Sequence, residues 1–157
     1  MLDCNTGKMW LKDASCLGPW PYEDGGNPNI FEMVTDLNNG TDFGCADYTA
    51  GTYTDWEVPT ISELCSAGAS VQPCPAGNAS DSLVDSSVPG SPKVVNAQGD
   101  AGWTTDGDAF VGVQSGNYWS ATEINTGSAW NVDLGNGDVN STLKGFFLYV
   151  WLVRVGQ

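Results

Sequence analysis

The chain has 157 residues, a length that fits one domain able to bury about two-thirds of the surface that its unfolded form exposes. Its formal net charge is -14, with only five Lys and Arg, which argues against nucleic acid and sulfated glycans as partners because binding them needs clustered cations. No apolar run comes close to the length of about 20 residues that a membrane span requires, so membrane insertion is not expected.

Five cysteines lie in the first half of the chain, and the odd count leaves at least one of them unpaired. Zinc is disfavoured because the intervals between cysteines are long and the sequence contains no His. We predict two disulfides, Cys16–Cys45 and Cys65–Cys74. Disulfides indicate an oxidising compartment, so the domain is expected outside the cell or on a cell or virion surface, without its leader segment.

The first half of the chain predicts a hairpin and two short helices. Residues 2–12 form two short strands around an Asn-Thr-Gly turn. Residues 27–40 have apolar side chains at near-helical spacing, with Asn27 or Asn29 as the expected N-cap and Gly40 as the expected end.

The second helix is predicted within residues 59–68. Thr60 followed three residues later by Glu63 is a capping-box pattern, and Gly68 is the expected end. Residues 72–107 are rich in Pro, Gly, Ser, Asn and Asp and predict a long irregular excursion inside a single domain spanning residues 1–157. Trp103 is the expected anchor of this excursion.

Strand patterns crowd the last third of the chain, and an Asn-Gly pair at 136–137 marks a hairpin turn. This part is therefore predicted to be antiparallel sheet. The predicted strands lie within residues 109–113, 117–122, 128–139 and 146–155.

Five motifs follow one another along almost the whole chain: TGKMWLKDA at 6–14, DWEVPTISEL at 55–64, VQSGNYWSAT at 113–122, AWNVDLGNG at 129–137 and VWLVRVGQ at 150–157. In this combination the chain resembles the C-terminal domain of the Legionella collagen-like adhesin. The resemblance implies an α+β domain with a C-type lectin-like fold, a twisted, mostly antiparallel sheet with two short helices and long irregular loops. It also implies that the first and last strands are neighbours.

Tryptophans make sense as the scaffold of such a fold, since each buries a large apolar area and carries an N–H that needs a partner. Direct ligand contact is the alternative role for each of them. The scaffold tryptophans are Trp10, Trp56, Trp119, Trp130 and Trp151.

Two positions depart from the family pattern. Glu57 stands where the family commonly has Arg, which replaces the cation of a local salt bridge by an anion. The family often has Pro or Cys at the position of Leu152, so Cys4 lacks a partner on the final strand and is the expected free thiol.

A subset of these domains is similar to the variable proteins of diversity-generating retroelements, in which copying of template adenines randomises chosen codons. Changing the adenines of an AAC or AAT codon never yields Lys, Glu, Gln, Met or Trp. We call a set of residues that lie between the motif residues within 118–150 the filling, and none of its members is of these five types. The resemblance implies that this filling faces the ligand. Leu134, Gly145 and Leu148 belong to the filling. The candidate ligand-binding residues are Ile124, Asn125, Thr126, Gly127, Ser128, Asp133, Gly135, Asp138, Asn140, Ser141, Thr142, Leu143, Phe146, Phe147 and Tyr149.

Residues 145–149, GFFLY, place large apolar side chains in succession, where alternation on a strand turns only every second one inward. Some of them are therefore expected on the surface. Exposed aromatic rings among small polar residues are typical of an antibody-like binding surface. The alternative is that Phe146, Phe147 and Tyr149 cover a loop or a subunit contact, and the sequence leaves the oligomeric state open.

No catalytic site is predicted. Without His there is no imidazole chemistry, and a carboxylate pair such as Asp106 and Asp108 is typical of a loop or of calcium ligands. No cofactor is expected, and a structural calcium ion at residues 105–110 is the alternative to a solvated turn. The chain also lacks the Glu-Pro-Asn or Gln-Pro-Asp triplet of sugar-binding C-type lectins.

The sequence therefore predicts a non-catalytic recognition domain, a retroelement-diversified variable protein that binds protein or cell-surface ligands through about residues 118–150. The alternative is a fixed-sequence adhesin or envelope domain of the collagen-like adhesin type.

Overall fold

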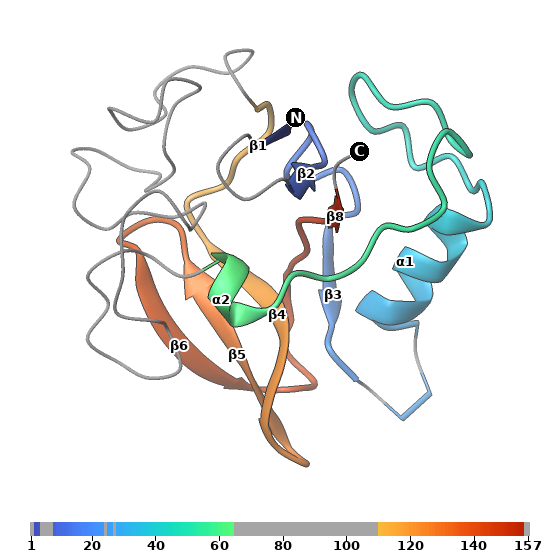
Figure 1. The fold of residues 1–157 in the computed structure, drawn as a ribbon. Coiled ribbons are helices and arrows are strands. Elements are labelled where there is room, and N and C mark those ends of the chain that lie inside the picture. Colours follow the sequence, from blue (N-terminus) through green and yellow to red (C-terminus); the bar gives the residue numbers. More distant parts are fainter. Residues whose placement is uncertain (1, 4–7, 24, 27, 65–109, 156–157) are drawn as a thin grey trace.

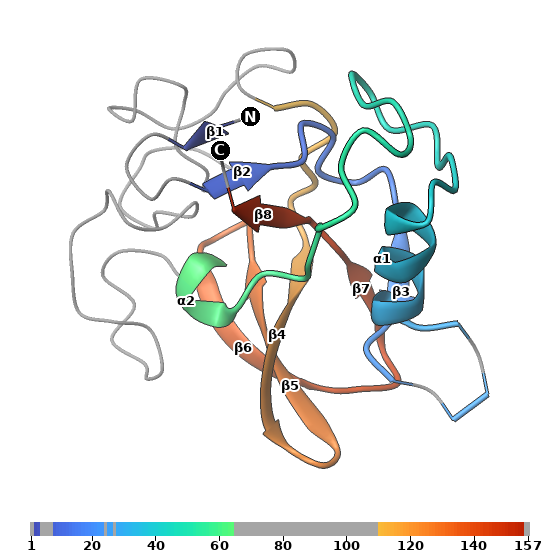
Figure 2. The same ribbon diagram turned by 45° about the vertical axis from the view of Figure 1, so that its right-hand side comes forward.

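The computed structural model describes residues 2–3, 8–23, 25–26, 28–64 and 110–155. Within these ranges two sheets and two short helices confirm the predicted α+β class (Figure 1). Residues 39–60, between the two helices, form a long loop without regular helix or strand (Figures 1 and 2).

The smaller sheet joins the two ends of the chain. It has the order β1-β2-β8, with β1 (Leu2–Asp3), β2 (Lys8–Trp10) and β8 (Val153–Val155). Both pairings are antiparallel, and Trp10 lies opposite Val153. The antiparallel pairing of two strands within residues 2–12 and the adjacency of the first and last strands are thus confirmed, whereas the predicted turn at 5–7 lies outside the described residues.

The larger sheet has the order β3-β7-β4-β5-β6 and carries the C-terminal third of the chain (Figure 1). Its pairings are antiparallel except for one parallel bridge between β4 and β7. The predicted turn at 136–137 connects β5 to β6. The strands are β3 (Pro19–Pro21), β4 (Asn117–Asn125), β5 (Ser128–Asp133), β6 (Asp138–Leu143) and β7 (Phe147–Tyr149).

The first predicted helix is α1 (Ile30–Asn38), and Asn29 is its N-cap. The Asn29 side chain accepts hydrogen bonds from two backbone N–H groups, and Glu32 accepts one from the Asn29 N–H at 3.0 Å, which completes a capping box. Gly40 follows the helix with a φ of +92°, a conformation that favours glycine. The buried face of α1 consists of Ile30, Met33, Val34 and Leu37.

The second predicted helix is α2 (Ile61–Leu64), a single turn. One half of the predicted capping box is present, because Glu63 accepts a hydrogen bond from the Thr60 N–H at 2.7 Å; the Glu63 N–H itself donates to the Thr60 backbone carbonyl at 3.1 Å. The Ile61 N–H donates to Thr122 Oγ1 of β4 at 3.0 Å, which fixes α2 on the large sheet. The expected end at Gly68 lies outside the described residues.

The strand predicted at 109–113 is wrong for its described residues. Val111 forms only an isolated bridge with Asp13. Gly112 has a φ of +67°, and a side chain there would place its Cβ 2.7 Å from Ser15 Oγ and 2.8 Å from Asp13 Oδ1. The backbone bends at Gly112 instead of continuing as a strand, since left-handed φ angles do not occur in regular sheet.

The strand predicted at 146–155 divides into β7 and β8, which belong to different sheets. Val150, Trp151 and Leu152 between them are all buried. Three successive buried side chains do not fit the two-faced alternation of one strand, so the chain crosses from one sheet to the other here. Trp151 Nε1 donates to the Leu11 carbonyl at 2.7 Å and links this crossing to the N-terminal segment.

Four of the five tryptophans that the sequence predicts as scaffold are buried, at most 4% exposed: Trp10, Trp56, Trp119 and Trp151. Trp130 is only partly buried. Trp119 Nε1 donates to the Trp20 carbonyl at 3.0 Å. Trp56 Nε1 has no hydrogen-bond partner in the described part of the chain, although the Tyr48 and Tyr53 rings stand edge to face with its own ring.

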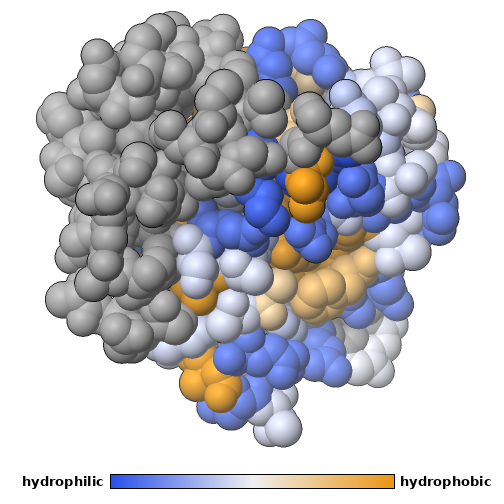
Figure 3. All heavy atoms as spheres, viewed as in Figure 1, coloured by the Kyte–Doolittle hydropathy of each residue, from blue (hydrophilic) through white to orange (hydrophobic). Residues whose placement is uncertain are grey.

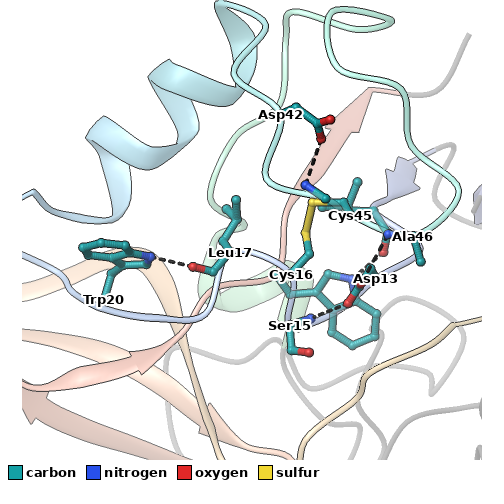
Figure 4. The surroundings of a disulfide bond; sticks show 11 residues. Asp13, Ser15, Cys16, Leu17, Trp20, Asp42, Cys45 and Ala46 are labelled. Carbon is teal, nitrogen blue, oxygen red and sulfur yellow. Dashed lines mark hydrogen bonds between the residues drawn. A yellow bond between two sulfur atoms is a disulfide. The ribbon is translucent and has the colours of Figure 1, made fainter.

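The Cys16–Cys45 disulfide is present as predicted (Figure 4). Around it, the Asp13 carboxylate accepts hydrogen bonds from the Ser15 and Ala46 N–H groups, both at 3.2 Å. The segment after β2 is therefore tied to the loop after α1 by a covalent bond and by a neighbouring polar contact.

Several sequence predictions lie outside the described residues. They concern the Cys65–Cys74 disulfide, the free thiol of Cys4, the Trp103 anchor and the whole excursion at 72–107. In the part of the chain that is described, no helix has the length and apolar character needed to cross a membrane.

Replacing Cys16 and Cys45 together by Ser should lower the free energy of unfolding by about 2–4 kcal/mol, since the disulfide restricts the unfolded chain. Urea unfolding followed by tryptophan fluorescence measures this change. The double variant is preferable to chemical reduction, which also acts on the other cysteines. An unchanged unfolding midpoint would show that the polar contact at Asp13 holds this junction without the covalent bond.

Candidate functional site

Large apolar side chains are exposed at one end of the large sheet. Leu143, Phe146 and Phe147 are 60%, 57% and 58% exposed, and Ile124 is 41% exposed. On the coloured part of the face in Figure 3, apolar areas lie among hydrophilic ones, and one of them is near the lower end, where Figure 1 draws the end of the large sheet. We call residues 124–128 and 143–147 the tip surface.

The two segments of the tip surface are held together by backbone hydrogen bonds. Ser128 of β5 is paired with Leu143 of β6. The Lys144 N–H donates to the Gly127 carbonyl at 3.0 Å, and the Phe146 N–H donates to the Leu143 carbonyl at 3.1 Å. The β4–β5 hairpin thus projects from the molecule with the β6–β7 link beside its turn (Figure 2).

The run GFFLY divides between surface and core, as its sequence predicts. Phe146 and Phe147 are exposed, whereas Leu148 and Tyr149 are partly buried and pack against the core. Phe147 lies opposite Pro21 of β3, so the end of β7 is fixed by an antiparallel pairing. The two exposed rings therefore stand on ordered backbone, which is a requirement of a preformed binding surface.

Lys144 lies at the centre of the tip surface and is itself buried. Its carbonyl accepts hydrogen bonds from the Tyr22 N–H at 2.9 Å and the Glu23 N–H at 3.2 Å. Its ammonium is 2.8 Å from Glu123 Oε1 and 3.1 Å from Glu23 Oε2, and it lies 5.0 Å from the centre of the Tyr22 ring. Lys144 thereby connects the β4–β5 hairpin, the β6–β7 link and the segment after β3.

The charges around Lys144 stabilise one another. The hydrogen bond from Lys144 lowers the pKa of the Glu123 carboxyl, and the same bond raises the pKa of Lys144. Burial, followed by the nearby Glu123 charge, raises the pKa of Tyr22 to about 12. The Tyr22 hydroxyl remains protonated at neutral pH and donates to the Ala121 carbonyl at 3.0 Å.

The middle of the predicted binding region lies on β6, the last strand of the large sheet in the described chain. Asn140 and Ser141 are exposed. Thr142 is partly buried, and its Oγ1 accepts a hydrogen bond from Asn131 Nδ2 at 2.8 Å. Thr142 therefore serves the sheet as well as the surface.

Four candidate residues lie away from the tip surface. Asp133, Gly135 and Asp138 are at the β5–β6 turn, the opposite end of the hairpin from the Ser128–Leu143 pair. Tyr149 stacks on the buried ring of Tyr118, with ring centres 5.3 Å apart. The structure thus divides the predicted set instead of gathering it into one patch.

The expectation that the filling residues face the ligand is wrong for Leu134, which is fully buried. Its N–H donates to the Gly116 carbonyl at 2.9 Å, which draws the β5–β6 turn onto the start of β4. The pattern of residue types could not separate this core leucine from the exposed Leu143.

Asp55 and Glu57, on either side of Trp56, each lie near a cation. Asp55 forms two hydrogen bonds with the Arg154 guanidinium, at 2.6 and 3.1 Å, and they lower the pKa of its carboxyl. Glu57 Oε1 lies 3.9 Å from Lys8 Nζ. In the described chain, no three His, Cys, Asp or Glu side chains are grouped to hold a metal ion.

Sequence reasoning missed the role of Lys144, Tyr22 and Glu23. One signal was available, because Lys144 is the only cation between Lys93 and Arg154 in a strongly acidic chain. Nothing in the sequence indicated that Tyr22 and Glu23, more than a hundred residues earlier, would meet it.

The family comparison agrees with the motifs and with the fold. A family model described as the Lcl C-terminal domain matches residues 1–154. The chain belongs to the Lcl C-terminal domain family. Membership of this family and the Cys16–Cys45 disulfide both fit an adhesin-like domain. No curated protein matches the chain in sequence.

Replacing Lys144 by Met, which keeps the aliphatic stem but removes the ammonium, should raise the pKa of Glu123 towards the ordinary value of about 4.3. It should also speed amide hydrogen exchange at Tyr22 and Glu23, since the carbonyl that accepts both bonds loses its side-chain anchor. NMR titration and exchange measure both effects.

The control for this experiment is Lys144→Arg, which retains the cation and should keep the pKa of Glu123 low. An unchanged Glu123 titration in Lys144→Met would contradict the role assigned to the ammonium.

Proposed function

We propose that this domain is a non-catalytic recognition module that binds protein or cell-surface ligands through the tip surface. The observation that carries the proposal is the exposure of Leu143, Phe146 and Phe147 on a backbone fixed by pairing and by the buried Lys144. Rigid aromatic and aliphatic groups supply contact area, and Asn125, Thr126 and the neighbouring small residues supply adaptable hydrogen bonds.

We further propose that the domain is a variable protein of a diversity-generating retroelement. Trp and Lys are residue types that adenine changes cannot produce, and Trp119 and Lys144, which are not filling residues, are both buried. The filling residues of the tip surface, by contrast, are exposed except for the partly buried Ser128. Such a division lets the ligand-contacting side chains change while the residues that determine the fold stay constant.

The absence of catalysis is part of this proposal. The sequence contains no His, which removes the commonest general acid or base. The carboxylates nearest the tip surface, Glu23 and Glu123, are engaged with Lys144. The hydrogen bond from Lys144 lowers the pKa of Glu123, which is the opposite of the raised pKa that a general acid needs at neutral pH.

The flanking DNA separates diversification from its alternative, a fixed-sequence adhesin or envelope domain. A variable protein should have a nearby copy of its 3′ region that is almost identical and differs only at adenines, together with a reverse-transcriptase gene. Sequencing the locus is the measurement. A locus with neither feature would leave the fixed-sequence adhesin as the function.

Recognition through the tip surface predicts that its side chains can change without loss of the fold. Replacing Phe146 and Phe147 together by Ser should leave the melting temperature within about 2 °C, because exposed side chains contribute little to stability. Leu134→Ala, at a buried filling position in the β5–β6 turn, should cost about 2–5 kcal/mol.

A displayed library varied at residues 124–128, 143 and 145–147 should then yield binders to a test protein. A library varied at Asp133, Gly135 and Asp138 is the matched control and should yield none. Unfolding of the Phe146 and Phe147 variant, or equal yields from both libraries, would contradict the assignment of the tip surface.

A further inference from the structure

The tip surface has an acidic border. Glu23 and Glu123 flank Lys144, and their side chains are 64% and 52% exposed, whereas the side chain of Lys144 is 8% exposed. Solvent therefore meets two carboxylates, while the single ammonium that pairs with them lies underneath. A ligand that approaches the exposed Leu143 and Phe146 meets net negative charge.

No described cation elsewhere offsets this charge, because each of them has its own partner. Lys8 pairs with Glu63 at 2.8 Å, Lys12 with Asp47, and Arg154 with Asp55. The whole chain carries a formal net charge of -14. The long-range field of the domain therefore attracts cations and repels anions.

This charge also selects among the occupants of the apolar patch. A second copy of the chain brings the same net charge of -14 and so approaches against repulsion. A basic protein surface meets complementary charge, which speeds encounter and orients the bound segment. Charge complementarity thus favours a basic protein partner over self-association.

We propose, on the basis of the recognition function above, that the tip surface binds a basic segment of a partner protein. Apolar side chains of that segment pack on Leu143, Phe146 and Phe147. Its Lys or Arg side chains contact the exposed oxygens of Glu23 and Glu123, and Lys144 sets the separation of these two carboxylates.

The test uses two short synthetic peptides with the same Leu and Trp content, one rich in Lys and one with Glu in place of each Lys. Titration of the isotopically labelled domain should show NMR shifts concentrated at residues 124–128 and 143–147 for the Lys peptide. Its dissociation constant should be at least about tenfold lower than that of the Glu peptide, and this difference should shrink as salt is added.

Variants locate the effect. The double variant Glu23→Gln with Glu123→Gln should lower the affinity for the Lys peptide by at least about fivefold. The control variant Asp133→Asn with Asp138→Asn removes two carboxylates at the far end of the hairpin and should change this affinity by less than about twofold. Equal affinities for the two peptides, or equal effects of the two carboxylate pairs, would overturn the proposal. Thermal unfolding of each variant confirms that the fold is retained.

The Phe146 and Phe147 double Ser variant keeps the two proposals separable. If the tip library yields binders but the Lys peptide does not bind the parent domain, the basic partner is overturned and the recognition surface stands. If the Lys peptide binds the double variant as tightly as it binds the parent domain, its contacts lie elsewhere on the acidic surface and the basic-partner proposal fails. Self-association at the concentrations used, detected by sedimentation, would likewise overturn it in favour of a second copy.

Discussion

A buried ammonium group determines how the exposed end of the large sheet is built. Lys144 is 6% exposed, and a charge in that position is costly unless other groups compensate it. Two carboxylates and the Tyr22 ring do so, from segments far apart in the sequence. Because the same residue also receives two backbone hydrogen bonds, the exposed side chains on either side of it have a defined position.

The stability of the domain is located away from the tip surface. The first and last strands pair in the small sheet, and Trp151 joins the crossing between the sheets to Leu11. Trp119 makes the equivalent link from β4 to Trp20. Since these contacts involve buried frame residues, the exposed side chains at the tip surface, unlike Lys144, are free to vary with little effect on folding.

Charge has a double role in this domain. The cations in the described chain are each held in an ion pair, so the remaining acidic groups give the surface its sign. An acidic surface of this kind maintains solubility around an exposed apolar patch. It also restricts what can bind there, because ligands that are themselves strongly acidic meet repulsion before any apolar contact forms.

Local sequence determined the elements whose signals are local. The capping box at Asn29, the hydrogen bond from the Thr60 N–H to Glu63 and the turn at 136–137 depend on residues a few positions apart, and all three are present. The aromatic motifs were likewise sufficient to indicate the family and most of the buried tryptophans. Tertiary structure decided the split of 146–155 between two sheets, the burial of Leu134 and the partners of Lys144. Each of these depends on contacts between segments distant in the sequence, where residue type alone does not tell an inward side chain from an outward one.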